Sequence, residues 1–368
     1  MLNERDDFKE QLNKCSEQLL MQDGIALGSY VLSSTENGVI IQSLVPFIAL
    51  YCRSAQEYFG ERIIEDETDK QVNDIRNGLK LYSDRYSKAK SVVLDLDHEQ
   101  NTVFKNMLRF DFMKNWNIHY NLGVYFDSEG HIVGDTQHLS YFLNLPNMDY
   151  SEQSRRAFEI GRLLGNKFAT FLRVKYNIEI QKVRINLPNY PHIGYRDFNT
   201  NRKSMFFVKN SNKELSLIFL HILSSIGFVE YILKAVSIEG DLWLFRIEYI
   251  TAHYAWSALK KIKNYHTSNY SKEYELIDPA ESIINEGTSL FSSLFRNCMM
   301  HYDLYYQGQS AIKPEYFDVE KPFFGLVESC FDNKSFDDFA SDLRIYIHKL
   351  ETFLLSWFNV DIKKIKWD

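Results

Sequence analysis

The chain has 368 residues, of which 45% are hydrophobic and 25% are charged. These values are ordinary for globular proteins and exclude collagen-like, coiled-coil and wholly disordered structures. The net charge is −7, from 42 basic and 49 acidic residues, which argues against a broad, non-specific nucleic-acid-binding surface because such surfaces are basic. Only 7 prolines and 16 glycines occur, and this scarcity favours long helices with short connections.

No zinc ribbon is predicted, because the four cysteines form no Cys-x-x-Cys pair. Nothing in the sequence suggests a secreted disulfide framework, and a reducing compartment is expected. The N-terminal segment is polar and lacks the apolar core of a signal peptide. The most apolar stretch, Leu215 to Val229, is shorter than the ~20 residues that cross a bilayer. We therefore expect a cytoplasmic protein with no membrane segment, and the sequence predicts no cofactor and no metal. The cysteines are Cys15, Cys52, Cys298 and Cys330.

Apolar residues at three-to-four spacing predict several helices in the first half of the chain. A β-hairpin is also predicted, because the apolar runs 124–126 and 131–133 flank the turn sequence Asp127-Ser128-Glu129-Gly130. The expected helices cover residues 5–22, 41–59, 72–90, 103–117 and 151–176.

The helical pattern breaks over residues 184–212, which contain two prolines and several asparagines. We place a domain boundary there, between a mostly helical recognition or regulatory domain (1–205) and a helical bundle (206–368). The fold class is therefore mainly α: an antiparallel four-helix bundle preceded by a helical domain with one small β-hairpin. The four bundle helices are expected over 213–236, 241–264, 279–306 and 336–358.

A short motif lies late in the third expected bundle helix, where Arg296 and Asn297 precede His301. An arginine, a polar residue and then a histidine in this helix resemble the signature of the HEPN superfamily of small helical domains. The resemblance covers about residues 213–360. It implies a HEPN-like bundle and metal-independent cleavage of RNA by a homodimer in which two motifs share one cleft. It also implies a toxin or phage-defence effector, with an antitoxin or defence-system protein as a possible partner.

The residue types in the motif suit cleavage of RNA by its own 2′-hydroxyl group. Imidazole exchanges protons near neutral pH, which suits His301 to acid–base catalysis. The guanidinium of Arg296 can hold a phosphate and stabilise the charge of the transition state, and Asn297 can orient either group. Products with a 2′,3′-cyclic phosphate and a 5′-hydroxyl are what the resemblance implies.

The spacing raises a geometric question, because residues five apart on a helix point about 140° from each other. Asn297 and His301 share a face, whereas Arg296 does not point directly along it. Arg296 must curl round, the helix must distort, or a second subunit must complete the site. The resemblance favours the second subunit.

Three further residues are candidates for substrate binding: Arg202, Lys203 and Tyr305. Arg202 and Lys203 belong to a basic and aromatic segment that can grip a single strand by phosphate contacts and stacking. A solvated interdomain loop is the simpler explanation of that segment. Tyr305 lies four residues after His301, one helical turn further along the same face.

Two other functions are open at this point. The bundle can be a non-catalytic module for dimerisation or for binding a nucleotide or partner, with Arg296 and His301 in structural roles. This hypothesis gains weight from the charge of residues 206–368, which carry 17 basic and 22 acidic side chains, a net of −5. Alternatively, Asp95, Asp97 and His98 can form the site of a metal-dependent nuclease, although they lack the glycine and distal glutamate of a calcium loop.

Four residues have structural explanations beside functional ones. Glu248, His253 and Glu286 can partner Arg296, but surface salt bridges explain them more simply. His221 sits in a strongly apolar helix and is interpreted as a core histidine with its hydrogen bonds satisfied.

Overall fold

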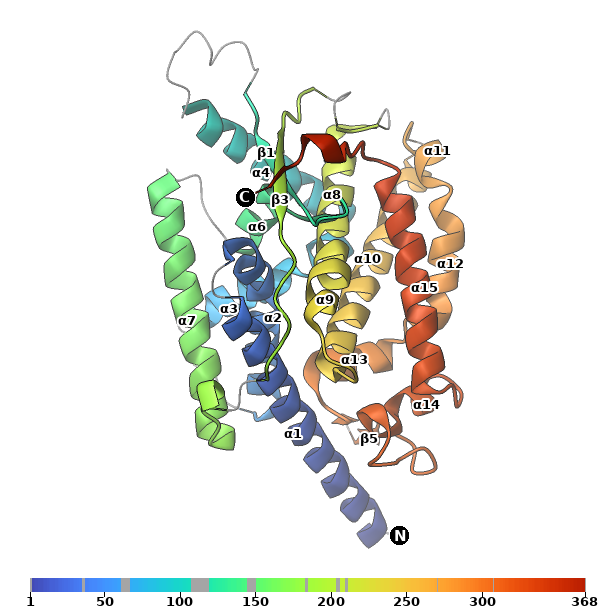
Figure 1. Cartoon of the computed structure of the whole chain (residues 1–368). Coiled ribbons are helices and arrows are strands. Elements are labelled where there is room, and N and C mark those ends of the chain that lie inside the picture. Colours follow the sequence, from blue (N-terminus) through green and yellow to red (C-terminus); the bar gives the residue numbers. More distant parts are fainter. Residues whose placement is uncertain are drawn as a thin grey trace.

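The structure is a computed structural model that describes residues 2–34, 37–60, 67–106, 119–143, 150–182, 185–202, 206–208, 211–269, 271–306 and 308–367. The chain is mainly helical and carries a small antiparallel sheet at one end of the helices (Figure 1). The predicted mainly α class with a small β-hairpin is therefore confirmed.

Two helices of the first half differ from the prediction. The single helix expected over 72–90 is two helices, over 67–78 and 86–106, because the chain turns after Gly78 and forms a 3₁₀ turn over 81–83. The first helix of the chain runs to Ser33 rather than residue 22 and passes through Gly24 and Gly28, where a side chain would collide with Tyr51, Leu172 and Ile180. Asn37 caps the second helix by accepting hydrogen bonds from two backbone amides. Part of the helix expected over 103–117 lies outside the described residues. The helices and short 3₁₀ turns are α1 (Leu2–Ser33), α2 (Gly38–Tyr58), α3 (Glu67–Gly78), η1 (Leu81–Ser83), α4 (Tyr86–Asn106), α6 (Thr136–Phe142), α7 (Tyr150–Tyr176) and η2 (Ile180–Lys182).

The sheet joins segments from both sides of the proposed domain boundary. Its first two strands form the predicted hairpin. The Asp127 carboxylate closes its turn by accepting hydrogen bonds from the backbone amides of Glu129 and His131. The third strand lies inside the segment proposed as the boundary, and the fourth is at the C-terminus. The strands are β1 (Leu122–Phe126), β2 (Ile132–Asp135), β3 (Gly194–Phe198) and β6 (Lys366–Trp367), in the order β2-β1-β3-β6, all antiparallel.

The second half contains the expected long helices, which run alternately up and down in Figure 1. The third pattern differs from the prediction of one helix over 279–306. It is broken at Phe291, and Ser292 caps a new helix that ends at His301. The remaining elements are α8 (Lys213–Gly227), the π-helix η4 (Phe228–Leu233), α9 (Lys234–Val236), α10 (Leu242–Ser268), α11 (Tyr274–Ile277), α12 (Ala280–Leu290), α13 (Ser293–His301), β4 (Tyr305–Tyr306), β5 (Gln309–Ser310), η5 (Pro322–Gly325), α14 (Leu326–Cys330), α15 (Phe336–Leu355) and η6 (Ile362–Lys364).

One hydrophobic core extends through both halves of the chain, from Leu12 to Ile365. The backbones of α8 and β2 also approach each other closely: a Cβ atom at Gly227 in α8 would lie 1.9 Å from the carbonyl oxygen of Ile132 in β2. By length and composition alone, two helical segments are apolar enough to cross a membrane. The most apolar stretch of each segment is mostly buried inside the protein: 72% of it in the segment 38–58 and 83% of it in the segment 213–236.

A buried ion pair ties the first helix to the end of the motif helix. Arg246 of α10 donates from Nε to Asp23 of α1 over 2.5 Å, and both side chains are almost fully buried. Its Nη1 donates to the carbonyl of Met299, near the end of α13, over 2.8 Å. The Tyr302 hydroxyl donates to the same carboxylate over 2.8 Å, and its ring packs against the guanidinium.

This ion pair holds a residue in an unfavourable backbone conformation. Tyr302 follows α13 with φ at 59°, in the left-handed region that usually favours glycine at a helix end. A bulky residue there is strained, and the bonds to Asp23 and Arg246 compensate. The position of α13 therefore depends on contacts with α1 and α10.

Replacing Asp23 with asparagine should destabilise the fold strongly. Asp23→Asn leaves the Arg246 charge buried and unpaired, which typically costs about 3–5 kcal/mol. Urea unfolding measures this loss. The control is Asp74→Asn, an exposed carboxylate on α3, whose unfolding free energy should change by less than about 0.5 kcal/mol. A loss below about 1 kcal/mol for Asp23→Asn would contradict the role given to the pair.

Candidate functional site

His301 lies at the C-terminal end of α13 beside a carboxylate from α2. Its Nδ1 is 2.8 Å from Oε2 of Glu57, and both side chains are about one-third exposed. Arg53, one turn earlier on α2, donates from Nε to the other oxygen of Glu57 over 2.6 Å. The hydrogen bond to His301 and the one from Arg53 lower the pKa of Glu57 to about 2, against a smaller opposing effect of burial. Glu57 is therefore ionised at neutral pH and fixes the orientation of the imidazole.

An open pocket of about 660 Å³ lies in front of His301. Asn297 points into it from the same face of α13, as four-residue spacing requires. Asp303 also lines the pocket, and burial raises the pKa of its carboxyl group. The lining residues are Glu57, Tyr58, Leu294, Asn297, Cys298, His301, Asp303, Gln309, Ser310 and Ala311. The pocket is large enough for a small polar ligand, and it contains two acidic groups.

Arg296 points to the other side of α13, toward α10. Its Nη1 donates to the side-chain oxygen of Asn297 over 2.7 Å, while its Nε is buried without a hydrogen-bond partner. Burial raises the pKa of Tyr254, whereas the nearby Arg296 charge lowers it. The pKa of His253 falls to about 4 through burial and the Arg296 charge. Arg296 and His301 thus belong to adjacent but different surfaces of one short helix.

The two predicted substrate-binding residues that the structure describes, Arg202 and Tyr305, are not among the residues that line the His301 pocket. Arg202 is exposed on the turn after β3. Lys203 lies outside the described residues. Tyr305 was predicted one helical turn beyond His301, but α13 ends at His301, so Tyr305 lies on β4 instead. Its hydroxyl donates to the Gly308 carbonyl.

The two glutamates considered as partners of Arg296 lie next to other basic residues. Glu286 pairs with Lys349 over 2.7 Å. Glu248 is buried 3.9 Å from Lys234 and 3.8 Å from Arg344, and burial raises its pKa to about 7. Neither carboxylate pairs with Arg296 among the described residues.

The residues of the alternative metal site do not converge. The buried Asp97 accepts hydrogen bonds from Asn121, Gln137, Thr200 and Lys213, while Asp95 and His98 are exposed on α4. Within the part of the chain that the structure describes, no group of three His, Cys, Asp or Glu side chains is placed to hold a metal ion. Asp97 instead ties α4 to the sheet and to the start of α8.

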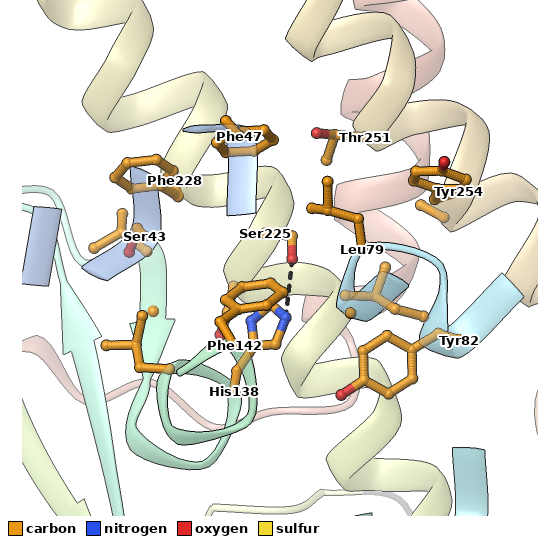
Figure 2. Close-up of a pocket in the computed structure, with 17 residues that line it drawn as sticks. Ser43, Phe47, Leu79, Tyr82, His138, Phe142, Ser225, Phe228, Thr251 and Tyr254 are labelled. Atoms are coloured by element: carbon orange, nitrogen blue, oxygen red, sulfur yellow. Dashed lines mark hydrogen bonds between the residues drawn. The ribbon is translucent and has the colours of Figure 1, made fainter. Parts of the chain in front are cut away.

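A second polar cluster is fully internal. His221 is completely buried, with its Nδ1 2.5 Å from the Tyr82 hydroxyl and its Nε2 3.3 Å from the Asp135 carboxylate. The burial confirms the prediction of a core histidine, but its hydrogen bonds are satisfied only in part, because Nε2 has no hydrogen-bond partner. The neighbouring His138 lies 3.4 Å from the Ser225 hydroxyl, as drawn in Figure 2. The cavity beside them is about 50 Å³, which holds one or two water molecules rather than a substrate.

The buried histidines should make the fold sensitive to mild acid. Burial lowers the pKa of His138 and of His221 to about 3, whereas an unfolded imidazole titrates near 6.5. As the pH falls below about 6.5, the unfolded chain binds protons that the folded chain does not. Each histidine therefore contributes a loss of up to about 1.4 kcal/mol per pH unit, down to about pH 3.

The slope of unfolding free energy against pH tests this assignment. We expect His138→Gln to reduce the slope between pH 4.5 and 6.5 in urea unfolding experiments. His98→Gln, which removes an exposed histidine, should leave the slope unchanged. Equal slopes for wild type and His138→Gln would show that His138 is protonated in the folded protein.

Comparison with known proteins does not identify the chain. No family model, no curated protein and no solved structure matches it. The function is therefore argued from the residues and their geometry.

Proposed function

We propose that the protein is a metal-independent endoribonuclease whose site includes His301, Arg296 and Asn297. The observation that carries the proposal is the pair of His301 and Glu57 at the edge of an open pocket. A proton-transferring imidazole with an ionised carboxylate on one ring nitrogen is a common arrangement for general acid–base catalysis. The HEPN-like arrangement of the bundle is part of the same proposal.

The proposed reaction uses groups of this chain alone. His301 takes the proton from a 2′-hydroxyl as the oxygen attacks the adjacent phosphorus. The bond from phosphorus to the 5′-oxygen breaks, and the protonated His301 returns the proton to that oxygen as it leaves. The products are a 2′,3′-cyclic phosphate and a 5′-hydroxyl. Glu57 is a positioning residue that holds the imidazole and stabilises its protonated form.

Arg296 provides the positive charge that phosphoryl chemistry needs. Its guanidinium keeps one buried nitrogen unpartnered and has no carboxylate partner among the described residues. A planar guanidinium binds two phosphate oxygens at once and stabilises the extra negative charge of a five-coordinate phosphorus. Asn297, bonded to Arg296 and lining the His301 pocket, connects the two groups.

A second function is favoured by one specific observation: the pocket in front of His301 contains the carboxylates of Glu57 and Asp303. Acidic groups repel a phosphate backbone. In that case the His301–Glu57 contact serves to fasten α13 to α2, and the bundle is a non-catalytic module that dimerises or binds a partner.

Cleavage assays separate the two functions. With cellular RNA as substrate, His301→Ala should lower the rate at least about 100-fold, the usual contribution of general acid–base catalysis. Wild-type cleavage should persist in a chelator. His348→Ala, an exposed histidine on α15, is the matched control and should cleave normally. Absence of cleavage by the wild type, or equal rates for wild type and His301→Ala, would contradict the nuclease proposal.

We also propose that the protein acts in the cytoplasm as a toxin or phage-defence effector held in check by a partner protein. Expression of the wild type should then arrest growth and degrade RNA, whereas His301→Ala should permit growth. Normal growth with intact RNA in wild-type cells would contradict this role.

A homodimer is the proposed assembly, and mixing two inactive variants tests whether the site is shared. In a mixed dimer of Arg296→Ala and His301→Ala, one site is intact only if each site takes its arginine and histidine from different subunits. Recovery of about a quarter of the wild-type rate or more after co-expression indicates a shared site. No recovery shows that each site, if catalytic, uses the residues of one chain.

A further inference from the structure

Three basic side chains near α13 lack the carboxylate partners that buried or half-buried cations normally have. They are Arg76 of α3, Lys80 in the turn that follows α3, and Arg296 of α13. Arg76 is nine-tenths buried, yet its Nε has no hydrogen-bond partner, and the same is true of Nε of Arg296. Within the described ranges, neither Arg76 nor Lys80 makes a side-chain hydrogen bond or an ion pair. Unpaired buried cations are unfavourable and therefore indicate a missing anion.

Arg76 and Lys80 are brought together by the end of α3. Beyond Gly78 the chain makes a tight turn, in which the amides of Leu79 and Lys80 donate to the carbonyls of Arg76 and Asn77, three residues earlier. These bonds are of the 3₁₀ type, and the turn keeps Arg76 and Lys80 close to each other in space. Leu79 of this turn and Tyr254 of α10 line the same small cavity, as Figure 2 shows.

Arg296 reaches the same place from α13, because Met300, four residues later on the same face of the helix, accepts a hydrogen bond from the Tyr254 hydroxyl over 3.2 Å. The charges of Arg76 and Arg296 both act on Tyr254 and on Lys80. Burial together with these two charges lowers the pKa of the Lys80 ammonium group to about 8. The three cations thus lie within electrostatic reach of one another and repel one another.

The nearest carboxylates are already paired elsewhere. Asp84 and Glu57 both act on Lys80, but Asp84 is bonded to Lys88 over 3.0 Å. Glu57 is bonded to His301 and Arg53. Among the described residues, no carboxylate forms an ion pair with Arg76, Lys80 or Arg296.

We propose that Arg76, Lys80 and Arg296 form a binding site for a phosphate group. Phosphate fits because it carries up to two charges, and its oxygens can accept bonds from two guanidinium forks and one ammonium group at once. The site combines residues of both halves of the chain. If the proposed function holds, the phosphate belongs to RNA, and the cations place it beside His301. Only the identification of RNA as the ligand rests on the proposed function, whereas the phosphate site does not.

Binding of inorganic pyrophosphate and of a 2′-O-methyl RNA tetranucleotide tests the site without any cleavage, because the modified RNA lacks the attacking hydroxyl. Calorimetry in a phosphate-free buffer of low ionic strength should detect binding of at least one probe to the wild type. Arg76→Gln should weaken it about 10- to 100-fold, the usual effect of losing a charged hydrogen bond. Arg85→Gln removes an exposed arginine from the turn after η1 and should leave the affinity within about twofold.

A folding control is built into the experiment. Arg76→Gln relieves repulsion and removes no ion pair, so its melting temperature without ligand should equal or exceed that of the wild type. Lys80→Gln serves in its place if Arg76→Gln does not fold. Pyrophosphate should raise the melting temperature of the wild type and not that of the variant.

The outcomes distinguish this inference from the proposed function. Tighter binding of the RNA analogue than of pyrophosphate supports RNA as the source of the phosphate, and the reverse order supports a free phosphate compound. Phosphate binding without RNA cleavage keeps the site and rejects the nuclease. No binding of either probe to the wild type at millimolar concentration, or equal affinity in Arg76→Gln, overturns the inference even if RNA is cleaved.

Discussion

The buried pair of Asp23 and Arg246 is the interaction on which the rest of the site depends. Arg246 bonds the Met299 carbonyl near the end of α13, and Asp23 bonds the Tyr302 hydroxyl just beyond it. These bonds hold Tyr302 in a left-handed conformation and stop the helix at His301. The orientation of the motif helix, and with it the directions of Arg296 and His301, is thus determined by α1 and α10.

Ending the helix at this residue has consequences for both sides of α13. His301 reaches Glu57 on α2, and Ser54 of α2 bonds the Met300 carbonyl, so α2 forms one wall of the site. Arg296 faces α10 and the turn after α3. A helix that sits between the two halves of the chain can therefore combine a proton-transferring group on one surface with a cluster of cations on the other.

Much of the fold follows from apolar spacing, because long helices with one buried face give a strong periodic signal. The hairpin was predictable from its turn sequence, which the Asp127 carboxylate stabilises through backbone amides. The break at Phe291 was not predictable, because apolar spacing continues across it and only the capping serine marks the new start. The early end of α13 likewise depends on a tertiary ion pair that leaves no local pattern.

The candidate site was predictable only in part. The motif identified Arg296, Asn297 and His301, but Glu57 is 244 residues away from His301 in the sequence, and no spacing rule connects such residues. Arg76 and Lys80 belong to an ordinary charged segment by sequence, and only the structure shows that Arg76 is buried with an unpartnered Nε. The net charge carries no information about such a cluster, since it averages over the whole chain, whereas a few cations act locally.

The central claim is that His301 lies within reach of a bound phosphate backbone. Nuclear magnetic resonance of protein with ¹³C-labelled histidine, titrated with an uncleavable 2′-O-methyl RNA, tests it most directly. The account predicts that the His301 ring signals shift in a saturable manner while those of the buried His138 and His221 stay in place. Unchanged His301 signals at RNA concentrations that saturate binding would contradict it.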